Sequence, residues 1–380
     1  MSTREGETLG LPLGRVGITL AALFVFRLGL MVPLAGIDQA AVAVMMRTNW
    51  FALERVSLFT LGMVPLLSVY LLGETLRLVS PGFARWQAVP ANDRRLQRGL
   101  RLLALALAAL QAWGIAGALE SIDRLVAAPG WQFRIGVVVS LVAATAVLSW
   151  LADLVTRHGL CNGFWLLAVA PTVAGMLPSA GDTLERLRLG AMSIEAALAV
   201  VAYLVLSTVL LVGLDRAHHG ETGLAPPVGI WPPFLAYTAI GWLAAPGFRA
   251  AAEGGDGSRW LDPGKPAYIV VVGLLVATFA LRHGVLATRR EQTTIGAMRE
   301  NHGSTGPIIT SKPAPSVATP AEPSQRRIGL RLAAIAALAQ VAICVAGEMV
   351  MPASSLAVPG MWLIAIVLVA LRVLDGIRGA

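Results

Sequence analysis

Long apolar runs separated by short polar segments are the main pattern along this chain. A membrane-spanning helix needs about 20 predominantly apolar residues, and ten runs come close to that length. They cover residues 14–35, 52–79, 98–120, 133–154, 163–180, 192–214, 229–246, 266–287, 328–350 and 357–374. The pattern therefore predicts an all-α polytopic membrane protein with ten transmembrane helices.

Proline and glycine mark many boundaries, because both residues disfavour continuation of a helix. Pro33 follows the first run, and Pro178 is expected to close the fifth. The short fifth and seventh runs contain prolines of their own, Pro171 and Pro232-Pro233, so we expect both helices to be tilted or partly irregular. The first 13 residues are not enriched in basic residues, whereas a signal peptide begins with a basic region. This favours a true first helix over a cleaved signal peptide.

Composition agrees with the membrane assignment. Of 380 residues, 56% are hydrophobic and only 14% are charged, whereas roughly a quarter of a soluble domain is charged. A soluble or disordered chain is therefore excluded. There are 2 cysteines, Cys161 and Cys344. They exclude a disulfide scaffold and are expected to be small buried hydrophobes.

The net charge of +8 is carried almost entirely by arginine. With the N-terminus inside, roughly two thirds of the basic residues fall in cytoplasmic segments, which predicts cytoplasmic N- and C-termini. Two segments are notable: residues 80–101, with Arg94 and Arg95, and the long polar loop 288–327. Their positive charge either keeps these segments on the cytoplasmic side of the membrane or binds an acidic or RNA-containing partner.

Chemical motifs are missing from the sequence. There is no phosphate-binding loop, dinucleotide-binding glycine motif or H-E-x-x-H metal motif. The adjacent His218 and His219 have no third ligand nearby, so no metal, cofactor or enzymatic activity is expected. Arg27 is the one charge expected deep in a span, and few charges could line a pathway, which disfavours an ion or proton pump.

The ten helices divide into an N-terminal half, residues 1–190 with helices 1–5, and a C-terminal half, residues 191–380 with helices 6–10. With the N-terminus inside, the sixth helix starts outside, so the two halves would have opposite topology. Such inverted repeats place a shared pathway at their interface.

Several segments resemble, in order, motifs of the SecY family, the channel subunits of the bacterial Sec translocase. They are R-L-G-L-M-V-P-L-A-G-I-D from residue 27, S-L-F-T-L-G-M-V-P-L-L-S from 57, L-Q-A-W-G-I-A from 110, W-L-A-D-L-V-T-R-H-G-L-C-N-G from 150 and G-I-W-P-P-F from 229. The first half carries the more specific matches. The motif residues are Arg27, Gly29, Pro33, Gly36, Asp38, Gly62, Pro65, Asn162, Gly163 and Pro232.

The resemblance implies a protein-conducting channel shaped as a two-halved clamshell. In that family a ring of aliphatic side chains forms the central constriction, a plug helix closes it from outside, and a lateral gate opens to lipid. Matching positions give the ring candidates Met63, Leu67, Phe164, Ala168, Phe234 and Ala365.

The same resemblance implies partners. They are small SecE-like and SecG-like membrane subunits, unfolded preproteins and membrane lipid, with the SecA motor or a ribosome at the cytoplasmic loops and no direct nucleic-acid contact. Arg94 and Arg95 are candidate docking residues. Arg290 and Glu291 are two more, because they resemble the P-R-E motif of the eighth loop.

Three features depart from the family. The segment 47–55 replaces a longer stretch and lacks the F-S-G-G-A-L plug sequence, so the plug is either a single turn or missing. The sixth loop, residues 215–228, is short, and the eighth loop lacks the arginine of the P-G-I-R-P-G motif. The alternatives are therefore a specialised or inactive divergent paralogue, or a small-molecule transporter that reuses the fold.

Overall fold

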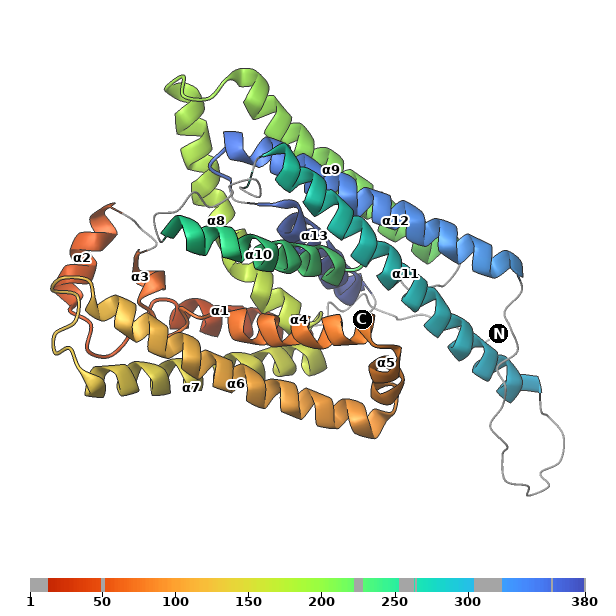
Figure 1. Cartoon of the computed structure of the whole chain (residues 1–380), viewed down its shortest axis with the longest axis horizontal. Coiled ribbons are helices and arrows are strands. Elements are labelled where there is room, and N and C mark those ends of the chain that lie inside the picture. Colours follow the sequence, from red (N-terminus) through yellow and green to blue (C-terminus); the bar gives the residue numbers. More distant parts are fainter. Residues whose placement is uncertain are drawn as a thin grey trace, which may run out of the picture. The chain divides into compact units, whose positions relative to one another are not determined.

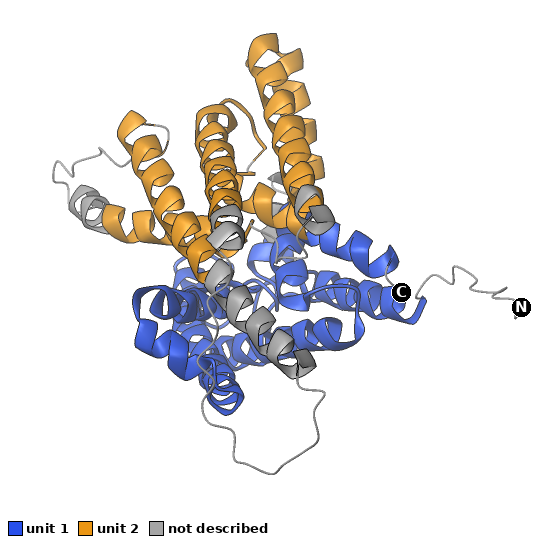
Figure 2. Ribbon diagram, turned by 90° about the vertical axis from the view of Figure 1, so that its right-hand side faces the viewer, with its two compact units in different colours: residues 1–174, 369–380 blue, residues 175–368 orange. Residues whose placement is uncertain are grey.

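The computed structural model describes residues 13–48, 52–221, 228–252, 263, 265–303, 323–356 and 358–378. Within these ranges the regular elements are helices, with two isolated β-bridges and no strand. The chain forms two compact units (Figure 2). Unit 1 comprises residues 1–174 and 369–380, and unit 2 comprises residues 175–368. The expected halves 1–190 and 191–380 rest on helix order and orientation, and they stay a prediction.

Each of the ten expected spans coincides with a helix (Figure 1). These helices are α1 (Leu13–Gly29), α4 (Val64–Val79), α6 (Pro90–Glu120), α7 (Trp131–His158), α8 (Gly163–Arg188), α9 (Ile194–Glu221), α10 (Trp231–Ala252), α11 (Pro266–Gly303), α12 (Pro323–Val350) and α13 (Gly360–Arg378). Within the described residues, seven of them (α6, α7, α8, α9, α11, α12 and α13) are long and apolar enough to cross a membrane.

Two of the ten helices are shorter than the apolar runs predicted. Helices α1 and α4 have 17 and 16 residues, about 25 Å of helix each at 1.5 Å per residue. The first run ends in turns that continue to residue 38, and the second run begins with the short helix α3 (Ala52–Arg55) followed by turns at residues 56–63. Another short helix, α2 (Gln39–Thr48), lies between the two runs.

Prolines do not break the fifth and seventh helices, which corrects the expectation from sequence. Helix α8 runs without interruption past Pro171 and Pro178 to Arg188. A proline removes one backbone donor, and a long membrane helix can tolerate this by bending. In α10, Pro232 lies in the first turn, where backbone donors have no helical partner in any case.

Helices also extend into segments expected to be loops. Helix α5 (Pro81–Gln87) and the start of α6 occupy the basic segment 80–101. Helix α11 continues to Gly303 and α12 begins at Pro323, so residues 288–303 and 323–327 of the expected long loop are helical. The middle of that loop, residues 304–322, lies outside the described residues.

Unit 1 is built on an antiparallel hairpin of α6 and α7 (Figure 1). Alanines at every fourth position of α6 are almost fully buried, which allows close helix packing: Ala104, Ala108, Ala112 and Ala116. Opposite them, Val137 and Leu141 of α7 belong to the same apolar core.

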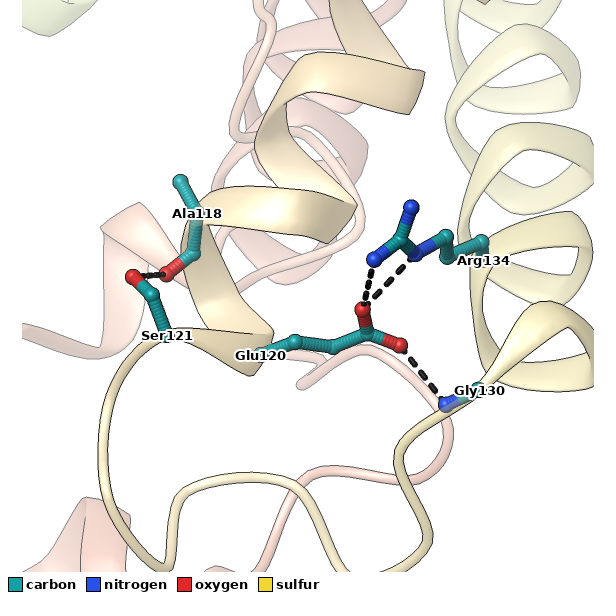
Figure 3. A network of polar contacts seen from close by, with 5 residues as sticks. All are labelled: Ala118, Glu120, Ser121, Gly130 and Arg134. Atoms are coloured by element: carbon teal, nitrogen blue, oxygen red, sulfur yellow. Dashed lines mark hydrogen bonds and ion pairs between the residues drawn. The ribbon is translucent and has the colours of Figure 1, made fainter.

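A carboxylate stabilises the turn between α6 and α7 (Figure 3). Glu120, the last residue of α6, accepts hydrogen bonds from Arg134 Nε at 2.7 Å and from the backbone N–H of Gly130 at 2.8 Å. Gly130 has φ 139°, a conformation that favours glycine. The Arg134 guanidinium also lies 5.6 Å from the centre of the Trp113 ring. One side chain thus joins the end of α6 to the start of α7.

Unit 2 is organised around α11, which packs along α10 and α12 (Figure 1), while α9 packs on α12. Glycines allow two of its close approaches. A Cβ on Gly284 would lie 2.6 Å from Cβ of Ala333, and one on Gly360 would lie 2.5 Å from Cα of Cys344. Cys344 is fully buried as expected, whereas Cys161, in unit 1, is only partly buried.

Candidate functional site

The motif at the end of α1 forms a compact turn against residues 54–59. Arg27 makes an ion pair with Glu54 of α3, so this arginine has an acidic partner. Gly29 lies directly against Phe59, because a Cβ at residue 29 would overlap the aromatic ring. Pro33 forms an isolated bridge with Ser57. The segment after α3 is therefore bonded to the end of α1.

Other motif residues set backbone conformation. Gly36 and Gly62 have φ of 87° and 51°, in the left-handed region that glycine occupies most easily. Asp38 accepts a hydrogen bond from the Ala40 N–H at 2.8 Å at the start of α2, as a helix-capping residue does. Pro65 lies in the first turn of α4.

The motif at the start of α8 also has a local role. The Asn162 side chain accepts a hydrogen bond from the Trp165 N–H at 3.3 Å and so caps the helix. A Cβ on Gly163 would overlap the carbonyl of Ala152 in α7. These residues fix how α8 leaves α7. Pro232 of α10 is buried in unit 2.

Four of the six ring candidates lie in unit 1, on two helix faces. Met63 and Leu67 are four residues apart at the start of α4, and Phe164 and Ala168 are four apart at the start of α8, so each pair shares one face. The aromatic rings of Tyr70 and Phe164 meet edge-on, with centroids 5.0 Å apart. Because Tyr70 is one turn beyond Leu67, this contact brings the two apolar faces together.

The other two ring candidates lie in unit 2. Phe234 of α10 meets Trp362 of α13 edge-on, with centroids 5.0 Å apart, and Ala365 is three residues further along α13. Both candidates are buried, at 3% and 0% exposure. Their place in a common ring with the unit 1 candidates stays a prediction.

Two aromatic residues of this site were missed by the sequence argument. Tyr70 and Trp362 each contact a ring candidate. The available signal was spacing, since Tyr70 follows Leu67 by three residues and Trp362 precedes Ala365 by three. Such spacing places residues on one helix face, but it does not show which neighbour the face meets.

Polar groups support the unit 1 site. Arg101 of α6 makes a two-pronged ion pair with Asp153 of α7, with N–O distances of 2.7 and 2.8 Å. The Tyr70 hydroxyl also interacts electrostatically with this guanidinium. Tyr70 therefore connects a charged pair on α6 and α7 to Phe164 on α8.

The predicted docking residues belong to α6 and α11. Arg94 and Arg95 are exposed in the first turns of α6. Arg290 and Glu291 lie in the backbone of α11, and their side chains are outside the described residues. Among the residues that the structure describes, no group of three or more His, Cys, Asp or Glu side chains could hold a metal ion.

Comparison with known proteins gives a consistent result. A protein-family model described as SecY matches residues 57–219. The protein translocase subunits SecY of Buchnera aphidicola subsp. Acyrthosiphon kondoi and of Escherichia coli K12 are each 28% identical over 323 residues. Each match covers 73% of this chain, and 90% and 72% of the respective relative.

The fold of the chain is similar to that of solved protein-conducting channels. A solved structure, described as showing that the plug domain of SecY stabilises the closed translocation channel, matches with a TM-score of 0.60 at 14% identity. The match covers 100% of this chain and 94% of the solved one. The ordered motifs, the helix succession and these relatives together show that the chain is similar to SecY proteins in sequence and in fold.

Proposed function

We propose that this chain is the channel subunit of a bacterial protein translocase, through which unfolded preproteins cross or enter the inner membrane. The observation that carries the proposal is the edge-on contact of Tyr70 with Phe164. It joins the α4 face of Met63 and Leu67 to the α8 face of Phe164 and Ala168. Two neighbouring helices thereby present bulky apolar side chains at one place.

An apolar constriction suits this function physically. Rings of bulky apolar side chains block hydrated ions by dewetting, and they can still yield around an extended polypeptide. An opening to lipid lets an apolar segment leave the pore according to its own transfer free energy. In the proposed channel, Phe234 and Ala365 complete the ring. Translocation through such a pore needs no catalytic side chain.

Orientation and partners follow from the charge distribution and the family. We place both termini in the cytoplasm, because the basic segments then lie inside. SecE-like and SecG-like subunits would surround the channel, and SecA or a ribosome would dock at Arg94, Arg95, Arg290 and Glu291. Preproteins and membrane lipid are the molecules handled.

A specialised channel is the second candidate function. Helix α3, at the place of the plug, is a single turn of 4 residues, and the eighth loop lacks the family's arginine motif. Both features favour a paralogue with a narrow substrate range over a general translocon. A small-molecule transporter is a weaker alternative, because its pathway would need polar groups to coordinate the solute.

Photo-crosslinking tests the channel proposal directly. A photoreactive residue is placed at Met63 or Phe234, and at the exposed positions Leu72 of α4 and Trp242 of α10 as same-helix controls. We expect a stalled secretory preprotein to be captured from residues 63 and 234 but not from 72 and 242. Capture of lipid alone from all four positions would reject the channel.

Complementation distinguishes the general from the specialised channel. The chain is expressed in bacteria depleted of their own SecY, at a level verified by immunoblotting. A specialised channel leaves growth unrescued although crosslinking at residue 63 still captures some preprotein. Full rescue of growth would show that docking of the general motor is intact.

A further inference from the structure

A carboxylate lies inside an apolar helix of unit 2. Glu348 belongs to α12, within the segment Leu330–Ala353 that is apolar enough to span a membrane. Ionisable side chains inside membrane helices are costly, and they usually face a partner within the protein that explains their presence. The proposed channel mechanism does not involve Glu348.

The partner of Glu348 is a tyrosine on α10. The Tyr237 hydroxyl donates a hydrogen bond of 2.6 Å to Glu348 Oε1, a length within the usual range for bonds between two oxygens. A second bond joins the same parts of the chain: Gln340 Nε2 donates to the carbonyl oxygen of Gly229, just before α10, at 3.3 Å. Gln340 is almost fully buried.

The two bonds share one register. Gly229 and Tyr237 are eight residues apart, and so are Gln340 and Glu348. The earlier residue of one segment bonds to the earlier residue of the other, and the later residue to the later. The segment from Gly229 into α10 therefore runs parallel to α12. Phe234, the ring candidate of α10, lies between the two bonded positions. The polar side chains of α12 therefore bracket the part of α10 that carries Phe234.

The surroundings of Glu348 are phenolic and apolar. Tyr203 of α9, Tyr268 of α11 and Cys344 of α12 are the titratable groups that act on this cluster. The Tyr203 hydroxyl is buried without a hydrogen-bond partner among the described residues. It faces Gly347, where a Cβ would lie 2.7 Å away. Tyr203 thus provides a matched buried hydroxyl that does not make the bond.

We propose that Glu348 is a positioning residue of the channel. Through Tyr237 it holds α10, and with it Phe234, in the register seen in this structure, while the Gln340–Gly229 bond fixes the segment just before α10. This inference rests on the proposed channel function. When the channel opens, α10 must shift, and the Tyr237–Glu348 bond must then break or exchange. The strength of this bond therefore sets the leak of ions through the resting channel.

A double-mutant cycle tests the bond without reference to transport. Tyr237→Phe, Glu348→Ala and the double variant are purified in detergent and their thermal unfolding is followed. We expect each single change to lower the midpoint by about 2–4 °C, with little further fall in the double variant because the bond is already lost. Tyr203→Phe is the control, and its effect should simply add to that of Glu348→Ala. Full additivity between Tyr237→Phe and Glu348→Ala would overturn the proposal.

Ion conductance of the resting channel in planar bilayers provides the functional readout. We expect Tyr237→Phe and Glu348→Ala to raise the leak about tenfold, the effect of losing one buried hydrogen bond. Glu348→Gln keeps an acceptor and should stay within about threefold of the parent if the bond, rather than the charge, is what matters. Tyr203→Phe should leave the leak unchanged.

The possible failures are distinguishable. If unfolding shows coupling and residue 63 still captures preprotein, but no variant changes the leak, the positioning role is wrong and the channel proposal stands. If residue 63 captures no preprotein and the protein forms no conducting pore in any variant, the channel proposal fails and this inference fails with it.

Discussion

The ring of Tyr70 lies edge-on against that of Phe164, with centroids 5.0 Å apart, while its hydroxyl interacts electrostatically with Arg101. One side chain thus combines an aromatic contact at the proposed constriction with a polar contact to the α6–α7 hairpin. Substitution by phenylalanine removes only the hydroxyl contact, whereas substitution by leucine removes both contacts, so comparing the two variants isolates the role of the ring.

Substitution of Tyr70 should separate these contacts. Tyr70→Phe keeps the edge-on pair, so preprotein export is expected to stay within about twofold of the parent. Tyr70→Leu removes an interaction of about 0.5–1.5 kcal/mol, and the Phe164 ring loses its support. We expect a several-fold rise in ion leak through the reconstituted channel for Tyr70→Leu alone. Equal leak for both variants would mean that the hydroxyl, and not the ring, matters.

The Arg101–Asp153 pair should depend on its two-pronged geometry. Arg101→Lys keeps the charge but cannot form both bonds, and Asp153→Asn removes the charge. Because both side chains are partly exposed, at 40% and 31%, we expect each change to cost about 1 kcal/mol. The measurement is thermal unfolding in detergent, and the double variant should be little worse than either single one. Arg98→Lys, at an exposed position of α6, is the control for loss of arginine.

Gly360 should not tolerate alanine. A Cβ there would lie 2.5 Å from Cα of Cys344, so α12 and the start of α13 would have to separate. Overpacking of this kind costs about 1–3 kcal/mol. Gly114→Ala is the matched control, since no atom lies within 4 Å of its added Cβ, and it should be neutral or slightly stabilising. Unchanged thermal stability of Gly360→Ala would show that the two helices are less closely packed than the structure indicates.

Cys161 should react slowly with alkylating reagents. It lies between α7 and α8, and burial raises the pKa of its thiol to about 11. Only the thiolate reacts. In a Cys344→Ala background, the alkylation rate should therefore increase about tenfold per pH unit between pH 7 and 10 without levelling off. A plateau near pH 9 would indicate an ordinary, solvated thiol.

The sequence predicted the helices well because a span of about 20 apolar residues is a strong local signal. The short α1 and α4 were not anticipated. The end of α1 depends on Gly29 lying against Phe59 and on the Pro33–Ser57 bridge, which are contacts between segments about 25–30 residues apart. The prolines of α8 were misread as breaks, since a proline in a long membrane helix can be accommodated by bending.

The partners of the charged residues could not be predicted from the sequence. Arg27 was recognised as deep, but its pairing with Glu54 depends on how α3 folds back on α1. Glu348 was not expected to lie deep in a span. Its bond to Tyr237 joins positions 111 residues apart, and local periodicity carries no information at that separation. The structural role of the motif glycines was easier to predict, because the positive φ at Gly36 and Gly62 explains why glycine is found there.

The pairing of Arg27 with Glu54 also bears on how a resting pore of this kind would hold back ions. Helix α3 is one turn long, and the residues after it are bonded to the end of α1, so it has little freedom to act as a removable stopper. In the proposed channel, closure then depends on whether water can fill the narrow apolar region. Such a barrier is a matter of wetting: one polar side chain in place of Leu67 would let a water column form, and the pore would conduct without any helix having moved.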